Sequence, residues 1–274
     1  MSFYISLSGL KGAQTDLGVV ANNVANVSSL AFKKSKAIFG DIYAGGGVGA
    51  GGNGVRLMDV RQQYTQGTLE TTDKTLDLAV TGEGFFTVKS ASPAQTVSYT
   101  RAGAFSMDKD RYIVDATGAR LQVLPTDPTG DGTPTGTAAA DLADLVIPTA
   151  HPDDAAIPLS AIAVSEKGIV TATFGDGSVR NLGVVAMATF PAQEELNQLG
   201  DAHWIASGDS GEATYSAGNS GMAGAVRSGT LERSNVDITE ELVALISAQR
   251  NFQANAKAIE TSSSMTQTIV NMRT

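Results

Sequence analysis

The sequence offers few side chains whose types and spacing could support catalysis or metal binding. Its two histidines are His151, which is followed by two aspartates after Pro152, and His203, which stands beside Trp204. An imidazole next to carboxylates could bind a metal ion or transfer protons, but such sites need several groups that converge from different parts of the chain. We therefore interpret His151 as a residue of a solvated loop and His203 as part of a packed edge, and expect neither to be a catalytic or metal-binding residue.

Other short motifs do not have the context that their chemistry needs. Asp127 and Asp131 lie in a loop that faintly resembles a calcium site, but the loop lacks alternating oxygen ligands and a closing glutamate. The sequence GEG at 82–84 leads into Phe-Phe-Thr-Val rather than into a helix, so it does not fit a dinucleotide-binding turn. The chain has no cysteine, which excludes a disulfide scaffold, a thiolate zinc site and a cysteine nucleophile. We expect no enzyme activity, no metal and no cofactor.

Composition and charge limit the remaining classes. The 274 residues carry 28 acidic and 19 basic side chains, and the net charge of -9 argues against a non-specific binder of nucleic acid or anionic membrane. No stretch approaches the ~20 apolar residues of a membrane span, and the opening MSFYISLSGLKG predicts no cleavable signal peptide. The chain is 42% hydrophobic but only 6% aromatic, which predicts a core of Ala, Val, Leu and Ile.

Both ends of the chain predict long helices with apolar residues at alternating spacings of four and three. In 2–27 the stripe consists of Phe3, Leu7, Leu10, Gln14, Leu17, Ala21 and Val24. In 237–272 it consists of Ile238, Leu242, Leu245, Gln249, Phe252, Ala256 and Ile259, and then drifts to Met265, Ile269 and Met272. Asp237 begins the second helix with a capping signal. Neither helix can bury its stripe alone, so the two must pair with each other or with other chains.

Between the helices the sequence predicts a β-rich body with Gly-rich joints on either side. The joints are 44–54 and 207–224. Apolar and polar residues alternate from Leu76, and turns are expected at 115–118 and at Asp176-Gly177. Further strand-like runs lie at 97–100, 112–114, 121–124, 161–164, 169–174 and 179–188. We predict an α+β chain with a coiled-coil-like helical domain (1–28 and 237–274), a connecting region (29–75 and 207–236) and an antiparallel β-rich domain (76–206).

Three blocks of the sequence resemble bacterial flagellar rod and hook subunits. They are VVANNVANVSSLAFKKSKAIFGDIY at 19–43, QGTLETTDKTLDLAVTGEGFFTV at 66–88 and GTLERSNVDITEELVALISAQRNFQANAKAIET at 229–261. The blocks occur in the family's order, which is far more specific than any one of them. The positions that we assign to the family signature are Asn22, Asn23, Asn26, Phe32, Asn235 and Arg250.

This resemblance implies a structural subunit of the flagellum. It implies that the terminal helices pair in a coaxial inner tube, with the β domain as an outer layer. It also implies that the chain passes unfolded through the flagellar type III export channel without a cleaved signal. Identical copies would then polymerise at the distal end under an assembly cap, with rod and hook–filament junction proteins at the two ends. The contact residues that we predict between subunits are Leu7, Leu10, Leu17, Val24, Leu242, Leu245, Phe252 and Ile259.

Two members of the family fit different features of the sequence. The opening MSFYISLSGLKGAQTDL and the short Gly-rich region 44–67 favour a hook protein, which forms a flexible joint outside the cell surface. The length of 274 residues is closer to a distal rod subunit, part of the straight drive shaft in the periplasm. We predict a minimal hook protein and keep the distal rod as the alternative. A secreted β-rich binding module with a coiled-coil stem, and an enzyme that uses His151 or His203, are the further alternatives.

Overall fold

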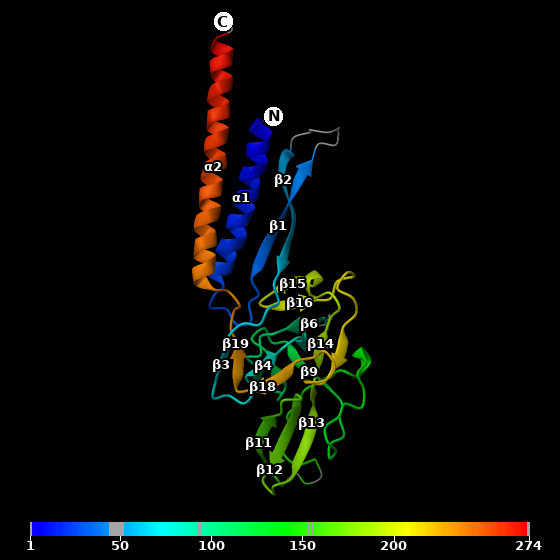
Figure 1. The fold of residues 1–274 in the computed structure, drawn as a ribbon. Helices are drawn as coiled ribbons and strands as arrows, with labels where there is room; N and C mark the ends of the chain where they lie inside the picture. The colour runs from blue at the N-terminus through cyan, green and yellow to red at the C-terminus, as the bar shows by residue number, and fades with distance from the viewer. Residues whose placement is uncertain (1, 44–51, 92–94, 153, 155, 273–274) are drawn as a thin grey trace. The chain divides into compact units, whose positions relative to one another are not determined.

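The computed structural model describes residues 2–43, 52–91, 95–152, 154 and 156–272. The chain forms two compact units (Figure 1). The helical unit comprises Met1–Ser28, Lys33–Tyr64 and Val236–Thr274, and the β body comprises Ser29–Phe32 and Thr65–Asn235.

The helical unit contains the two long helices that the heptad stripes predict. Helix α1 (Ser2–Ala25) has 24 residues and α2 (Ile238–Asn271) has 34, which correspond to lengths of about 36 Å and 51 Å. The helices run antiparallel, and α1 lies between α2 and a β hairpin (Figure 1). Because α1 has neighbours on two sides, it has a broader buried face than α2.

The expected signals mark the helix ends. The Asp237 carboxylate accepts the backbone N–H groups of Thr239 (2.8 Å) and Glu240 (3.2 Å), as an N-cap does. These hydrogen bonds, that of Glu240 first, hold the pKa of Asp237 below its ordinary value. At the same end of the pair, the backbone and side-chain amides of Asn26 both donate to the Asn22 carbonyl and close the last turn of α1.

The hairpin of the helical unit is a feature that the sequence analysis missed. Strands β1 (Ser35–Tyr43) and β2 (Gly52–Gln62) pair antiparallel from Ser35 opposite Gln62 onward, with a bulge after Ile38. The sequence analysis had assigned this segment to a connecting region. Most of the predicted joint at 44–54 lies outside the described residues, and its last three residues begin β2.

The β body is antiparallel throughout its described strands, as predicted. Thirteen of these strands form one sheet with the central order β11-β12-β13-β9-β5-β6-β16-β15, and the pairs β3–β19 and β4–β18 stand beside it. The strands of the body are β3 (Leu69–Thr71), β4 (Leu78–Thr81), β5 (Phe85–Lys89), β6 (Val97–Thr100), β7 (Ser106–Met107), β8 (Ile113–Val114), β9 (Arg120–Leu124), β10 (Ala143–Asp144), β11 (Leu159–Val164), β12 (Ile169–Phe174), β13 (Val179–Val185), β14 (Met187–Thr189), β15 (Asn197–Gly200), β16 (His203–Ile205), β17 (Thr214–Ser216), β18 (Ala225–Ser228) and β19 (Thr230–Glu232).

The core of the body is mainly aliphatic, but aromatic rings contribute more than the composition suggests. Phe85 packs against Phe190 and Trp204 at centroid distances of 6.1 Å and 5.5 Å. The predicted turns are present, and Gly118 and Gly177 both adopt positive φ. In the first turn Asp115 accepts the backbone N–H of Thr117, and in the second Asp176 accepts that of Ser178. The stretch 207–224, predicted as a joint, belongs to the body and contains β17 and the fully buried Ser210.

Candidate functional site

The face of α2 that packs in the helix pair follows a heptad stripe. Its buried and half-buried members at alternating spacings of four and three are Glu241, Leu245, Ala248, Phe252, Asn255, Ile259 and Ser262. Three of the predicted contact residues, Leu245, Phe252 and Ile259, belong to this stripe. The fourth on α2, Leu242, lies beside it and is 43% exposed.

On α1 the buried face is turned from the predicted stripe. Its most buried residues are Ala13, Val20 and Asn23, whereas the predicted contact residues Leu7, Leu10, Leu17 and Val24 are half-buried. At about 100° per residue, the two stripes differ by roughly a quarter turn or slightly more. The sequence could not show this, because α1 packs against the hairpin as well as against α2.

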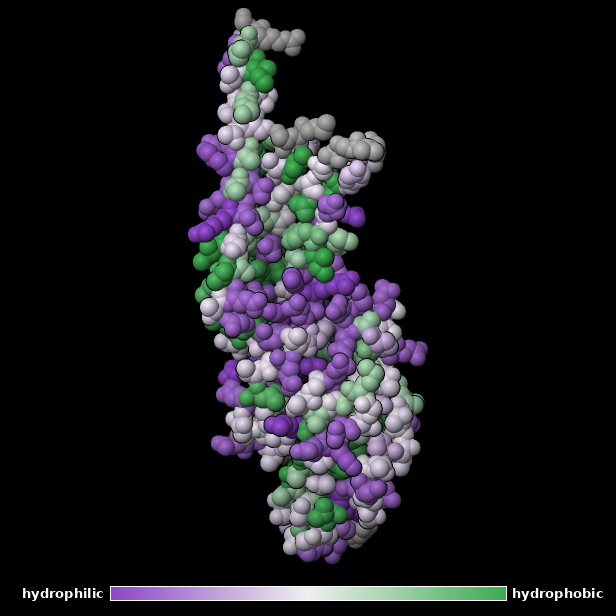
Figure 2. All heavy atoms as spheres, viewed as in Figure 1, coloured by the Kyte–Doolittle hydropathy of each residue, from purple (hydrophilic) through white to green (hydrophobic). Residues whose placement is uncertain are grey.

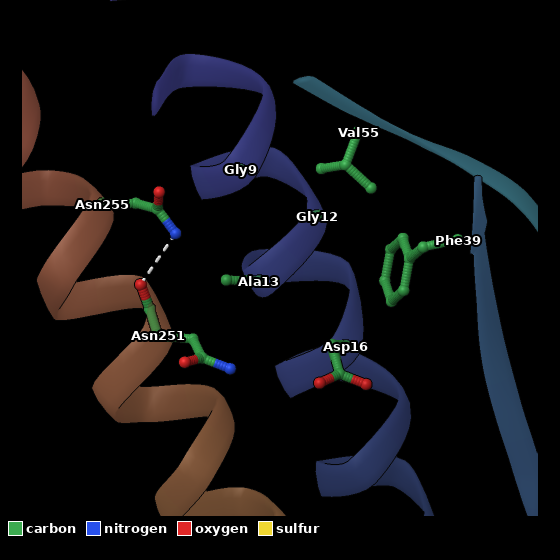
Figure 3. A pocket seen from close by; sticks show the side chains of 8 residues that line it. All are labelled: Gly9, Gly12, Ala13, Asp16, Phe39, Val55, Asn251 and Asn255. Carbon is green, nitrogen blue, oxygen red and sulfur yellow. Dashed lines mark hydrogen bonds between the residues drawn. The ribbon is translucent and has the colours of Figure 1, made fainter. Parts of the chain in front are cut away.

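Small residues bring the two helices close together near the start of α1. A Cβ atom at Gly9 would lie only 2.6 Å from Oδ1 of Asn255. Figure 3 shows Asn251 and Asn255 of α2 on one side of α1, and Phe39 and Val55 of the hairpin on the other. These residues line a groove of about 310 Å³ beside the first half of α1.

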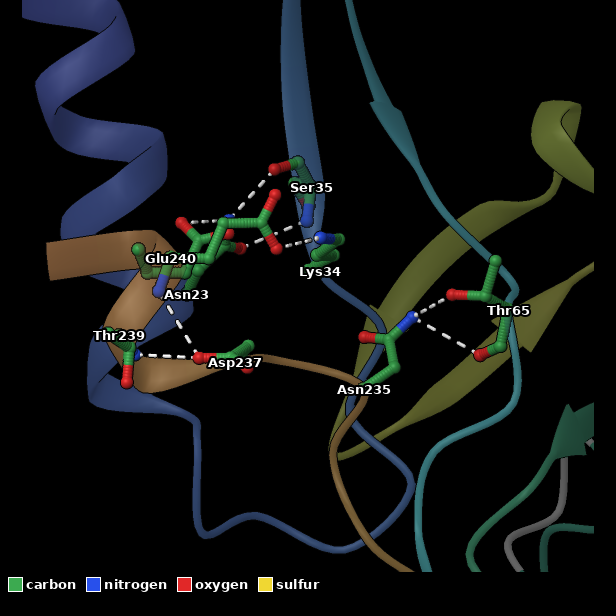
Figure 4. A network of polar contacts seen from close by, with 9 residues as sticks. Asn23, Lys34, Ser35, Thr65, Asn235, Asp237, Thr239 and Glu240 are labelled. Atoms are coloured by element: carbon green, nitrogen blue, oxygen red, sulfur yellow. Dashed lines mark hydrogen bonds and ion pairs between the residues drawn. The ribbon is translucent and has the colours of Figure 1, made fainter. Parts of the chain in front are cut away.

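A buried polar junction joins three elements at the other end of α1. Asn23 is 1% exposed, and its side-chain Oδ1 accepts the backbone N–H of Ser35 at 2.9 Å. Its Nδ2 donates to the Ser35 carbonyl at 2.9 Å and to Oε2 of Glu241 at 3.2 Å (Figure 4). One side chain of α1 is thus bonded to the first residue of β1 and to the first turn of α2. Nearby, Nζ of Lys34 pairs with the Glu240 carboxylate at 3.3 Å.

The remaining signature positions lie in different environments. Asn22 and Arg250 are exposed on their helices, and Asn26 ends α1. In the β body, the backbone N–H of Asn235 donates to the Phe32 carbonyl, and its Nδ2 donates to the backbone and side-chain oxygens of Thr65 (Figure 4). The signature therefore marks hydrogen-bonding positions in both units. The sequence analysis did not identify Glu241 and Ser35 as the hydrogen-bond partners of Asn23.

The helical unit leaves large apolar side chains exposed. Figure 2 shows apolar surface over the first turns of α2, where Ile238, Val243 and Ile246 are 49%, 61% and 48% exposed. At its other end, α2 continues beyond the start of α1, and Met265, Ile269 and Val270 are about as exposed. No charged residue occurs from Thr261 to Met272. Monomeric proteins rarely leave such extended apolar faces uncovered.

The β body contains two buried pairs of titratable side chains among its described residues. His203 is bonded through Nε2 to Oδ2 of Asp115 at 2.7 Å, and its Nδ1 lies 2.9 Å from the Asp201 carbonyl. Burial alone would lower the pKa of His203, but the contact with Asp115 outweighs it and raises that pKa. Arg101 and Glu232, which are far apart in the sequence, form a second buried pair with a 3.8 Å separation.

The structure gives the other chemical candidates ordinary roles. The ring of His151 packs edge-on against Phe174, and Asp153 beside it lies outside the described residues. Asp127 accepts hydrogen bonds from Thr129 within its own turn. Within the part of the chain that the structure describes, no group of three His, Asp or Glu side chains is placed to hold a metal ion. No helix there is long and apolar enough to cross a membrane.

Comparison with known proteins identifies two matching families. Residues 79–172 match the family described as "Flagellar hook protein FlgE/F/G D1 domain", and residues 227–272 match "Flagellar basal body rod FlgEFG protein C-terminal". These segments lie in the β body and along α2.

Full-length relatives carry the names of rod and hook proteins. The chain is 34% identical to the flagellar basal-body rod protein FlgG of Bacillus subtilis, over 99% of this chain and 98% of the relative. It is 30% identical to FlgG of Buchnera aphidicola subsp. Schizaphis graminum, with 97% of each chain covered. It is 26% identical to the flagellar hook protein FlgE of Salmonella typhimurium, with both chains covered completely in an alignment of 408 residues.

Proposed function

The chain belongs to the FlgE/F/G family of flagellar rod and hook proteins, and from this premise we propose that it polymerises with identical copies into the hook. In that role it is a structural subunit of a tubular joint that transmits torque from the rod to the filament. The opening residues 1–17 and the short Gly-rich region 44–67 support the hook rather than the rod. The copies would be exported through the flagellar type III channel, and rod and junction proteins would bind at the two ends of the segment.

The observation that carries polymerisation is the unpaired apolar surface of α2. The helix packs against α1 along one stripe, and Leu242, Val243 and Ile246 beside that stripe are 43–61% exposed. Exposed apolar area of this kind is stabilised when a further protein surface covers it. A head-to-tail assembly of identical copies supplies such a surface to every subunit except the last, and grows without closing. The eight predicted contact residues remain part of this proposal: Leu242 lies on the exposed surface, and the other seven are half-buried in the helical unit.

The distal rod is the second candidate, and the comparisons provide its support. Relatives named FlgG have the higher identities of 34% and 30%, and they align over 289 and 282 residues. The relative named FlgE aligns over 408 residues, so it contains segments that this chain lacks. A rod subunit would use the same helical surface in a straight shaft.

Electron cryotomography of cells that lack the gene distinguishes these functions. The hook proposal predicts a complete rod that reaches the outer surface and carries no hook. A truncated rod inside the envelope would contradict the hook and support the distal rod. A normal flagellum would contradict both candidates. Restoring the gene on a plasmid is the matched control and must restore the normal structure.

A further inference from the structure

The contacts between α1 and α2 define one register of the antiparallel pair. Gly9 lies against Asn255, and Asn23 lies against Glu241. Both pairs of residue numbers add to 264, so the register is the same near the two ends of α1. This register places residues 263–271 of α2 beyond the first residue of α1, and thereby decides which part of α2 extends alone.

Side chains of mixed size line the contact between α1 and α2. Gly9, Ala13 and Ala248 are small, whereas Leu245 and Phe252 are large and half-buried. If α2 slid by one heptad, Phe252 or Ile238 would take the place of Leu245, and Ile259 or Leu245 would take the place of Phe252. Nonpolar contact would therefore remain at these two positions after a slide.

Asn23 is the exception on α1. It is almost fully buried, and all three of its hydrogen bonds have fixed partners in Ser35 and Glu241. Glu241 is itself only 7% exposed. A slide of one heptad would bring Asn23 opposite Ala248 in one direction, or opposite Ser234, which precedes the helix, in the other. Either slide would separate the Asn23 amide from the Glu241 carboxylate and leave both groups buried without this hydrogen bond. The free-energy cost of two unsatisfied buried polar groups exceeds the net stabilisation that their hydrogen bond contributes.

We propose that the buried Asn23–Glu241 pair is the positioning element that fixes the register of α1 on α2. Asn23 also binds both backbone groups of Ser35, so the same side chain fixes where the β1–β2 hairpin begins along α1. A single buried Asn can set the register of a coiled coil in this way. The proposal concerns the fold of one chain and holds whether the assembled segment is hook or rod.

Disulfide cross-linking in the full-length chain measures the register directly. The chain has no cysteine, so an introduced pair forms without competition. Gly9→Cys with Asn255→Cys reports the observed register, because a Cβ at position 9 lies beside the Asn255 side chain. Gly9→Cys with Ala248→Cys, or with Ser262→Cys, each combined with Asn255→Ala to make room for the new Cβ at position 9, reports a slide of one heptad in either direction. Non-reducing electrophoresis separates bonds within a chain from bonds between chains.

The reporter pairs are compared in five backgrounds. In the unaltered chain only the 9–255 bond should form. Asn23→Ala and Glu241→Ala should each lower the ratio of the 9–255 bond to the slid bonds by about tenfold or more. Glu241→Gln keeps an acceptor for the Asn23 amide and should preserve the 9–255 bond. Asn22→Ala removes an exposed Asn one position earlier and is the matched control, which should change nothing.

Two results would overturn the proposal. One is a 9–255 bond that remains dominant in both Asn23→Ala and Glu241→Ala, because another contact would then set the register. The other is the loss of all three bonds in these variants while Asn22→Ala keeps its bond. The pair would then stabilise the helices without choosing between registers.

Discussion

At the scale of the residue, His203 is the side chain whose charge the structure determines most clearly. Its two ring nitrogens lie 2.7 Å from a carboxylate and 2.9 Å from a backbone carbonyl, both of which only accept hydrogen bonds. Both nitrogens thus face acceptors, which favours the protonated ring and agrees with the raised pKa of His203. Asp115 is its counter-ion: burial alone would raise the pKa of Asp115, but the hydrogen bonds from His203 and Thr117 lower it overall.

The charge of His203 makes the stability of the β body depend on pH. Since the pKa of His203 is raised by folding, its contribution is complete below the unfolded value of about 6.5 and is lost as pH rises through the folded value. Since the pKa of Asp115 is lowered, its contribution is complete above the unfolded value of about 4 and is lost as pH falls through the folded value. The pair therefore stabilises the body most between these two limits.

We predict that the free energy of unfolding of the body falls as pH rises above about 6.5 and through the raised pKa of His203. His203→Gln should lower stability by about 3 kcal/mol near pH 6, because it leaves Asp115 buried without its counter-ion. The same variant should remove most of the alkaline slope. Urea titration of the full chain between pH 5 and pH 9 measures both effects. Equal alkaline slopes in the two proteins would show that His203 is not the titrating group.

At the scale of the element, the surface of α2 divides into two parts with different roles. One stripe packs against α1, and the residues next to it are exposed although they are Leu, Val and Ile. An exposed Leu contributes little to the fold of a single chain, so its substitution affects stability by about 0.5 kcal/mol or less. The same substitution has a large effect if the face is covered by another subunit.

We predict that Leu242→Asp abolishes polymerisation while the chain keeps its fold. A carboxylate buried at a subunit contact would lack a counter-ion, and each added subunit would repeat that loss. Leu242→Met is the matched control, because it keeps an apolar side chain of similar volume and should polymerise normally. Sedimentation of polymers measures assembly, and circular dichroism of the soluble chain measures the fold. Normal polymers of Leu242→Asp would remove Leu242 from the subunit contact.

The sequence predicts those elements whose signals are local. The heptad stripes and the Asp237 cap predicted α1 and α2, and Asp-Gly or Asp-x-x-Gly spacing predicted the turns at 115–118 and 176–177, all of which are confirmed. The hairpin β1–β2 was missed because its strands flank a Gly-rich segment. The alternation of apolar and charged residues in Val55-Arg56-Leu57 and in Asp59-Val60-Arg61 was the available signal.

The candidate site was harder to predict, because it depends on contacts between distant segments. The heptad spacing on α2 identified Leu245, Phe252 and Ile259, which are half-buried, but its stripe also included the exposed Leu242, and α1 turns a different face inward to accommodate the hairpin. Asn23 was identified from the signature, whereas Glu241 and Ser35 had no local signal that marks them as its partners. The register of the helix pair and the partners of Asn23 depend on tertiary packing, which the periodicity of one segment does not reveal.

At the scale of the whole molecule, the two units differ in what they bury. The β body has a continuous core of aliphatic and aromatic residues and contains the buried pairs Arg101–Glu232 and His203–Asp115. The helical unit buries few large side chains completely and leaves apolar residues exposed along both helices and the hairpin. The body is thus complete within one chain, whereas the helical unit is suited to contacts with further copies.

The central claim is that the helical unit joins identical copies in a tube, and a helical reconstruction by electron cryomicroscopy of the assembled segment tests it most directly. We predict that α1 and α2 of each copy line the tube, that Leu242, Met265 and Ile269 are buried against neighbouring copies, and that the β bodies lie outside them. A reconstruction in which these three side chains remain exposed to solvent, with subunits joined through the β bodies alone, would contradict the account.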